Sequence, residues 1–175
     1  MFDILNKKKS NVVLIYNKIV SFSRNKFFYH EARLNDTFQT RVFLIFFHLS
    51  FLLIKIKENG DRYKKDSQKI FDYTFKSIDI NMRELGHGDV TVNKNMKELI
   101  KVFYNILLLS ETYMQINSKK RKAFIEKYFV TNGNLSNENI NHLLDYFNNY
   151  ASFCFELTIN SVLKGEINFK YKGIE

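Results

Sequence analysis

The strongest hydrophobic pattern in the chain is the run of residues 42–54, in which only His48 and Ser50 are not apolar. A helix that is apolar on nearly every side is either the centre of a bundle or a membrane span. Spanning a bilayer takes about 20 largely apolar residues, whereas a run of roughly 10–14 is more often a buried core helix. Because Arg41 and Lys55 close this run early, it predicts a buried central helix and no transmembrane segment.

The segments on both sides of this run repeat apolar residues every three or four positions, which is the spacing of one helix face. Ser10 or Asn11 would cap the first of these helices, and the pair Asp36 and Thr37 would cap the central one. The pattern predicts further helices over residues 11–25, 63–85, 93–116, 119–129 and 136–164.

Gly and Asn residues mark the predicted connections between these helices. Gly60 follows the central helix and suits the left-handed conformation found after a helix C-terminus. Gly86 and Gly88 predict a tight connection between two helices, and residues 131–134 form the clearest turn. The aromatic cluster at residues 27–29 is predicted to anchor a loop to the bundle.

The C-terminal part of the pattern changes from helical spacing to alternation. Ser136 and Asn139 open the last helix without forming a full capping box, and Gly165 ends it. Residues 166–171 alternate as an extended tail laid along the surface would. The chain is thus predicted to be an all-α, compact single-domain bundle of about six helices around the central one. Its parts are a flexible N-terminus (1–10), a helical domain (11–165) and an extended C-terminal tail (166–175).

Length and cysteine content fit this picture. A chain of 175 residues is most simply one domain and can bury a sufficient core without a disulfide or a metal. Cys154 is the only cysteine, which excludes an internal disulfide and a multi-cysteine metal site. Its place on an apolar helix face predicts a small buried side chain rather than a nucleophile.

The net charge of +9 admits two interpretations. It would attract nucleic acid or an anionic membrane. It also fits the bias of an A/T-rich genome, because Lys, Asn and Ile abound while Pro and Trp are absent, and we favour this second interpretation. The first residues contain no uninterrupted apolar segment of a signal peptide. We therefore expect a protein of the bacterial cytoplasm that contacts the inner membrane at most peripherally.

The sequence contains no arrangement typical of catalysis. The four histidines are scattered, and no HExxH motif or Gly-rich phosphate loop is present. We expect no catalytic residue, metal site or cofactor, and we interpret His48 as a neutral core histidine bonded to a nearby partner. The carboxylates Asp79 and Glu84, with Arg83 and Arg41, are expected to form ion pairs that orient helix ends, in preference to an acid–base pair.

Basic residues alternate with aromatic ones over residues 18–29 and 119–128. Such stretches can hold RNA through phosphate contacts and base stacking, so a general RNA- or ribosome-binding module is the alternative function. The aromatic residues fall on predicted core positions, however, which favours inward-facing rings and outward-facing lysines.

Three stretches of the chain, in order, resemble the ubiquinol–cytochrome c chaperone family. The first contains Arg24 with the aromatic cluster at residues 27–29, and the second runs from Asp36 through Arg41 to His48. The third, over residues 71–104, is the most specific. The resemblance marks these residues as motif or partner-binding candidates: Arg24, Phe28, Tyr29, Asp36, Arg41, Asp79, Arg83, Glu84, Gly86, Gly88, Asp89 and Lys94.

Lys26 and Asn35 stand where the family usually has proline, and Thr40 where it has glycine, so the loop before Arg41 can differ from the family pattern. The resemblance implies an all-α assembly factor for the cytochrome bc complex, with no reaction and no cofactor. It implies binding of newly made cytochrome b or another subunit of that complex. It further implies a small partner protein and the ribosome, as for mitochondrial members. We expect an apolar groove near the aromatic cluster at residues 27–29 to receive a client helix.

Overall fold

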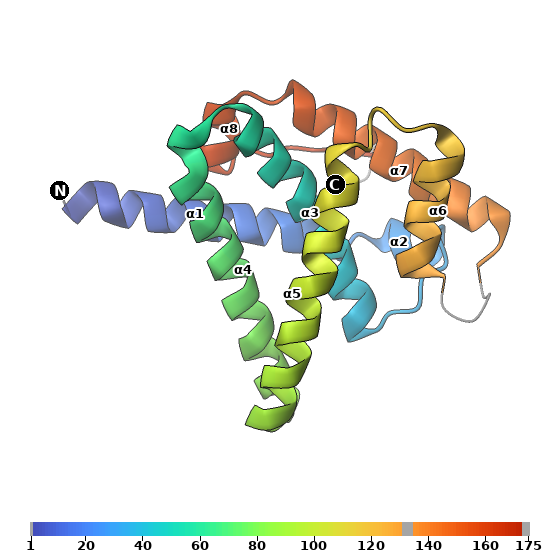
Figure 1. The fold of residues 1–175 in the computed structure, drawn as a ribbon, viewed down its shortest axis with the longest axis horizontal. Coiled ribbons are helices and arrows are strands. Elements are labelled where there is room, and N and C mark those ends of the chain that lie inside the picture. The colour runs from blue at the N-terminus through green and yellow to red at the C-terminus, as the bar shows by residue number, and fades with distance from the viewer. Residues whose placement is uncertain (1, 131–134, 173–175) are drawn as a thin grey trace.

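The computed structural model describes residues 2–130 and 135–172, and these form a helical bundle (Figure 1). The turn predicted at residues 131–134 and the tail residues 173–175 lie outside the described residues. The described part contains helices and no strand, which confirms the predicted all-α class. The elements are α1 (Phe2–Ser23), α2 (Lys26–His30), α3 (Phe38–Glu58), the 3-10 helix η1 (Asp61–Tyr63), α4 (Lys64–Glu84), α5 (Asp89–Glu111), α6 (Ser118–Phe129), α7 (Asn137–Glu156) and α8 (Ile159–Lys164).

Helix α3 is the central helix that the hydrophobic run predicts. The Thr37 side chain caps its start by accepting a hydrogen bond from the Thr40 backbone N–H at 3.1 Å, and Asn59 caps its end. All residues 42–54 are buried. The helix has the length and hydropathy of a membrane span, but 78% of its most apolar 18-residue window is buried inside the bundle. This burial agrees with a core helix.

The other helices surround α3, which contacts α1, α4, α5, α7 and α8. Figure 1 shows α4 and α5 running side by side as a hairpin that projects from one side of the bundle. Helices α6 and α7 pack together on the other side. The hairpin leaves α1 and the N-terminal half of α3 beside the end of α4, and this is where the candidate site lies.

The N-terminal region differs from the prediction in two places. Helix α1 begins at Phe2 rather than at Asn11, because the lysine-rich start favours helix and contains no glycine or proline to break it. The aromatic cluster predicted to anchor a loop lies in α2, which Asn25 caps by accepting a hydrogen bond from the Phe27 backbone N–H at 2.9 Å. Asn25 therefore starts a new turn of helix where the pattern predicted only a loop.

The bounds of α5 also differ from the prediction. It begins at Asp89, directly after Gly88, rather than at residue 93, and it ends at Glu111 rather than at residue 116. Asp89 in the first turn favours the earlier start because a carboxylate interacts well with the helix N-terminus. Gly60, predicted to be left-handed, has a positive φ of 102° but an extended ψ of 164°, and it leads into η1.

The last predicted helix is divided into α7 and α8. Thr158 caps α8 by accepting a hydrogen bond from the Ser161 backbone N–H at 3.1 Å, so the chain turns there although apolar spacing continues. At the start of α7, Ser136 and Asn139 do form a complete capping box, with the Asn139 side chain accepting from the Ser136 N–H at 3.2 Å. The prediction of an incomplete box was wrong because the amide oxygen of Asn accepts as well as that of Gln.

The C-terminal tail after Gly165 is extended as predicted, but it belongs to the core rather than to the surface. Its alternate side chains Ile167, Phe169 and Tyr171 are 0%, 9% and 5% exposed. The Tyr171 hydroxyl donates a hydrogen bond to the Asp145 carboxylate of α7 at 2.5 Å. Gly165 makes the turn in the left-handed conformation, where a side chain would lie 2.9 Å from Cβ of Leu14 in α1.

Candidate functional site

A cavity of about 240 Å³ opens between α1, α3 and the C-terminal end of α4. Three of the residues singled out from the sequence line it, and each comes from a different segment: Arg24 follows α1, Arg41 belongs to the first turn of α3, and Glu84 is the last residue of α4. Its apolar wall comes from Phe38, Val42, Ile45, Ile78 and Leu85. The fold thus brings together residues that are far apart in the sequence.

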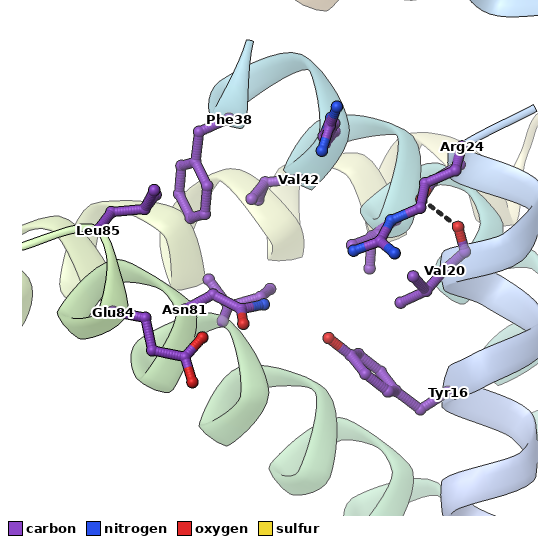
Figure 2. A pocket seen from close by; sticks show the side chains of 12 residues that line it. Tyr16, Val20, Arg24, Phe38, Val42, Asn81, Glu84 and Leu85 are labelled. Carbon is purple, nitrogen blue, oxygen red and sulfur yellow. Dashed lines mark hydrogen bonds between the residues drawn. The ribbon is translucent and has the colours of Figure 1, made fainter. Parts of the chain in front are cut away.

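Two charges at this cavity are uncompensated. Figure 2 shows Arg24 on the α1 side and Glu84 on the α4 side of the cavity. Both residues are exposed. Within the described part of the chain neither side chain forms an ion pair. Of the ion pairs expected at the helix ends, the one involving Glu84 does not form, since Arg83 bonds Asp79 and Asp89 instead.

Polar groups also extend into the cavity from its floor and sides. The Tyr16 hydroxyl and the Asn81 carboxamide point toward the space between α1 and α4 (Figure 2). Burial raises the pKa of the Tyr16 phenol, so this group stays protonated and can donate a hydrogen bond. The cavity therefore offers a cation, an anion, a hydroxyl and an amide beside an apolar wall.

Arg41 is held in place by another motif residue, Asp36. Its Nε and one Nη donate hydrogen bonds to the two carboxylate oxygens of Asp36 at 2.6 and 2.7 Å. This bidentate pair lowers the pKa of the Asp36 carboxyl. The nearby Tyr29 hydroxyl donates to the Ser23 carbonyl at 2.9 Å. Asp36 therefore positions Arg41 at the edge of the cavity.

The connection between α4 and α5 carries a second group of motif residues. Arg83 donates to Asp79 at 2.7 Å and also bonds Asp89 in the first turn of α5. The Arg83 pair lowers the pKa of the Asp79 carboxyl. Gly86 has a positive φ of 88°, a conformation that favours glycine. This ion-pair network joins the end of α4 to the start of α5, whereas the pairing expected between the α4 carboxylates and Arg41 does not form among the described residues.

Two candidates lie away from the cavity. Phe28 is fully buried and contacts Tyr146 with ring centroids 4.6 Å apart, so it cannot contact a partner, because α2 turns its ring into the core. Phe27 is buried too, and Tyr29 is half-buried. Within the described residues, the Phe27 and Phe28 rings therefore line no exposed groove, while Tyr29 is partly accessible. Lys94 is exposed on α5.

His48 is a core residue, as predicted. Its Nδ1 lies 2.6 Å from the Leu44 carbonyl and its Nε2 lies 2.8 Å from the Tyr146 hydroxyl. Because a carbonyl only accepts, Nδ1 carries the proton and Nε2 accepts from Tyr146. Burial lowers the pKa of His48 to about 4, so the ring is neutral. Cys154 is also buried, as expected.

The aromatic residues of the two basic stretches face inward. Phe27, Phe28, Phe124 and Tyr128 are all buried, so these rings form no exposed platform for base stacking. This agrees with the interpretation of the two stretches as core positions flanked by solvated lysines.

Sequence reasoning did not single out several side chains of the cavity, among them Tyr16, Asn81 and Leu85. A signal existed for Asn81, since it is a polar residue between the apolar positions Ile78 and Met82 of α4. Leu85 is 61% exposed at the C-terminus of α4, and such exposure is not visible in a sequence.

Fold and site together define an all-α protein with a recess of about 240 Å³ at its surface. The chain belongs to the ubiquinol–cytochrome c chaperone family, whose model matches residues 30–169. The crystal structure of the Cbp3 homolog from Brucella abortus is similar, with a TM-score of 0.84 and 22% sequence identity over 99% of this chain and 96% of that one. At this identity, the likeness establishes the shared fold. No curated protein matches the chain in sequence.

Proposed function

We propose that this chain is a non-enzymatic assembly chaperone for the cytochrome bc complex, and that it binds newly made cytochrome b at the cavity beside Arg24. One observation carries the proposal: in a member of the ubiquinol–cytochrome c chaperone family, Arg24, Arg41 and Glu84 converge on one surface cavity. Arg24 and Glu84 are exposed and form no ion pair within the described residues, so both charges are accessible to a partner.

The size of the cavity supports a protein ligand over a small molecule. Sites for cofactors and drug-sized ligands usually measure roughly 300–1,000 Å³, whereas this cavity measures about 240 Å³. It can accept one or two side chains of a helix laid across α1 and α4. A helix of a membrane protein that still lacks its neighbours offers apolar side chains with scattered polar ones, and the Phe38 and Leu85 wall with Arg24 and Glu84 matches both.

The proposed place of action is the bacterial cytoplasm at the face of the inner membrane. The net charge of +9, which genome composition also explains, would assist peripheral contact with anionic lipid or with ribosomal RNA. A small partner protein and the ribosome are part of the same proposal, and they rest on the resemblance to the family.

In the first experiment the gene is deleted from its native host, or exchanged for a variant. The amount of assembled cytochrome bc complex is then measured on native gels and by the absorbance of haem b. We expect deletion to lower the level of the complex. We expect the variants Arg24→Glu and Glu84→Lys to lower it while the chaperone itself stays folded and abundant. The matched control is Lys120→Glu, an exposed lysine of α6 away from the cavity. Normal levels of the complex after deletion would refute the proposed function.

A second experiment locates the contact. A photo-crosslinking amino acid at Phe38 or Leu85, beside the cavity, should capture newly made cytochrome b, whereas the same group at Lys120 should not. Retention of an RNA instead, with affinity that falls steeply as salt rises, would favour the alternative function of a general RNA-binding module.

A further inference from the structure

The outer face of α5 carries a row of residues that are exposed in the described chain. Lys94, Lys97, Lys101, Tyr104 and Leu108 follow one another at intervals of three or four, which places them along one side of the helix. All five are exposed. We call this row the α5 stripe. It is basic at the end near the hairpin tip and apolar at the other end.

The apolar end of the stripe continues into a second cavity. Tyr104 and Leu108 are 51% and 65% exposed, and Tyr104 packs on Phe71 of α4 with ring centroids 5.9 Å apart. The neighbouring Leu107 lines a cavity of about 340 Å³ whose walls also include Leu53 and Ile54 of α3. This cavity lies at the C-terminal end of α3, while the Arg24 cavity lies at its N-terminal end.

The charges near the stripe compensate its basic end only in part. Lys57 and Glu111, at the edge of the second cavity, pair with each other at 2.6 Å, and Lys101 pairs with Glu98 at 2.8 Å. Lys94 and Lys97 form no ion pair within the described residues. A ligand would therefore meet an excess of positive charge at Lys94 and Lys97, offset only in part by Glu98, and a recess with a partly apolar lining at the other end of α5.

We infer that the α5 stripe is a docking surface for an amphipathic helix of another protein, acidic toward one end and apolar toward the other. Acidic side chains would face Lys94 and Lys97, and large apolar ones would cover Leu108 and enter the second cavity. This partner surface is separate from the Arg24 cavity, and the inference does not depend on the proposed client.

Other occupants match the stripe less well. A second copy of this chain would bring its own lysines and a net charge of +9 to the same face. A helix that lies in a membrane surface has basic residues beside apolar ones along its whole length. Within the α5 stripe the three lysines precede Tyr104 and Leu108, and the apolar end lies beside a cavity.

The test uses a synthetic helical peptide of about 18 residues, long enough to cover the stripe at 1.5 Å per residue. One face has Glu in the first half and Leu and Phe in the second. A control peptide has Lys in place of each Glu. Fluorescence anisotropy measures the binding of each peptide to the whole chain. We expect the Glu peptide to bind and the Lys peptide to bind at least about tenfold more weakly.

Two variants then locate the binding. The double variant Lys94→Glu, Lys97→Glu should lose about tenfold in affinity for the Glu peptide and should gain affinity for the Lys peptide. Leu108→Asp should weaken both. The matched control is Lys119→Glu, Lys120→Glu on α6, which makes the same change in charge at exposed residues. Circular dichroism and thermal unfolding check that all variants are folded.

Three outcomes would overturn the inference. The first is equal binding of the two peptides by the unmodified chain. The second is unchanged binding in both stripe variants. In the third, the double variant loses binding to anionic phosphatidylglycerol vesicles or to a single-stranded RNA while its affinity for the Glu peptide is unchanged, which would assign the stripe to lipid or RNA. Preference for the Lys peptide by the double variant would support helix docking directly.

Discussion

The polar groups around His48 and those around Arg24 differ in whether they have bonding partners within the protein. His48 is fully buried and both of its ring nitrogens have partners, Leu44 and Tyr146. The Tyr150 hydroxyl also donates to the His48 carbonyl at 3.3 Å. At the Arg24 cavity, by contrast, the charges of Arg24 and Glu84 have no ion-pair partner within the described residues.

The difference shows that location and partners, rather than residue type, separate a structural group from a binding group. A buried polar group without a hydrogen bond is costly, so a core histidine persists only when it is fully bonded. An exposed arginine without a partner is solvated by water and costs little free energy, so it stays available for binding. The two regions should therefore respond in opposite ways to substitution, with stability lost at the first and function lost at the second.

The largest effect on stability is expected from His48→Ala. The variant leaves a void in the core and removes the group to which Tyr146 donates, so we expect a loss of roughly 3–5 kcal/mol in the free energy of unfolding. Denaturant unfolding measures it. His30→Ala, at an exposed histidine, is the control and should change stability little. Equal stability of the two variants would contradict the structural role of His48.

Acid should destabilise the protein through the same residue. The pKa of His48 is lowered from 6.5 to about 4 in the folded state, so between these values the unfolded state binds the extra proton. The contribution of neutral His48 to the free energy of unfolding is about 3 kcal/mol. It is fully present above pH 6.5 and is lost as the pH falls toward 4. Unfolding at a series of pH values measures this loss. His48→Gln should reduce the slope in this range, and His30→Gln should leave it unchanged.

A smaller loss is expected from Tyr146→Phe. The variant keeps the ring contact with Phe28 but removes the hydroxyl that donates to His48 Nε2, so a buried acceptor remains unbonded. We expect a loss of about 1–2 kcal/mol by chemical denaturation. Tyr104→Phe, at an exposed tyrosine, should change stability by less than about 0.5 kcal/mol. A Tyr146→Phe protein as stable as the original would show that the hydroxyl is dispensable.

The smallest change in stability is expected at the cavity. Arg24→Ala should alter the free energy of unfolding by no more than about 0.5 kcal/mol, because no ion pair within the described residues is lost. The same variant should lower the amount of assembled cytochrome bc complex in the native host. Two outcomes would contradict the contrast between the two regions. One is a large loss of stability in Arg24→Ala, and the other is a normal amount of assembled cytochrome bc complex with a stable Arg24→Ala protein.

Most of the bundle could be predicted from the sequence because its helices are strongly periodic and α3 is apolar on nearly every side. The break at Thr158 could not, since apolar spacing continues from α7 into α8 and only the local hydrogen bonds of Thr158 mark it. The same holds for α2, which depends on one cap at Asn25. Short elements depend on single side chains, whereas long ones depend on a repeated pattern.

The candidate site could be predicted only in part. The resemblance to the family singled out Arg24, Arg41 and Glu84, but no spacing in the sequence shows that they share a cavity. Phe28 was singled out by the same motif, and it lies in the core. A motif therefore identifies positions that matter without separating those that bind from those that pack. That separation requires the packing of α1, α3 and α4.

The extended tail after Gly165 has a consequence for biosynthesis. Ile167, Phe169 and Tyr171 fill the core next to residues of α2 and α7, such as Phe27 and Tyr146. A nascent chain cannot complete this packing until residue 171 has left the tunnel of the translating ribosome. Because the tail follows all the helices in the chain, the core around Phe27 and Tyr146 stays incomplete until these last residues are made.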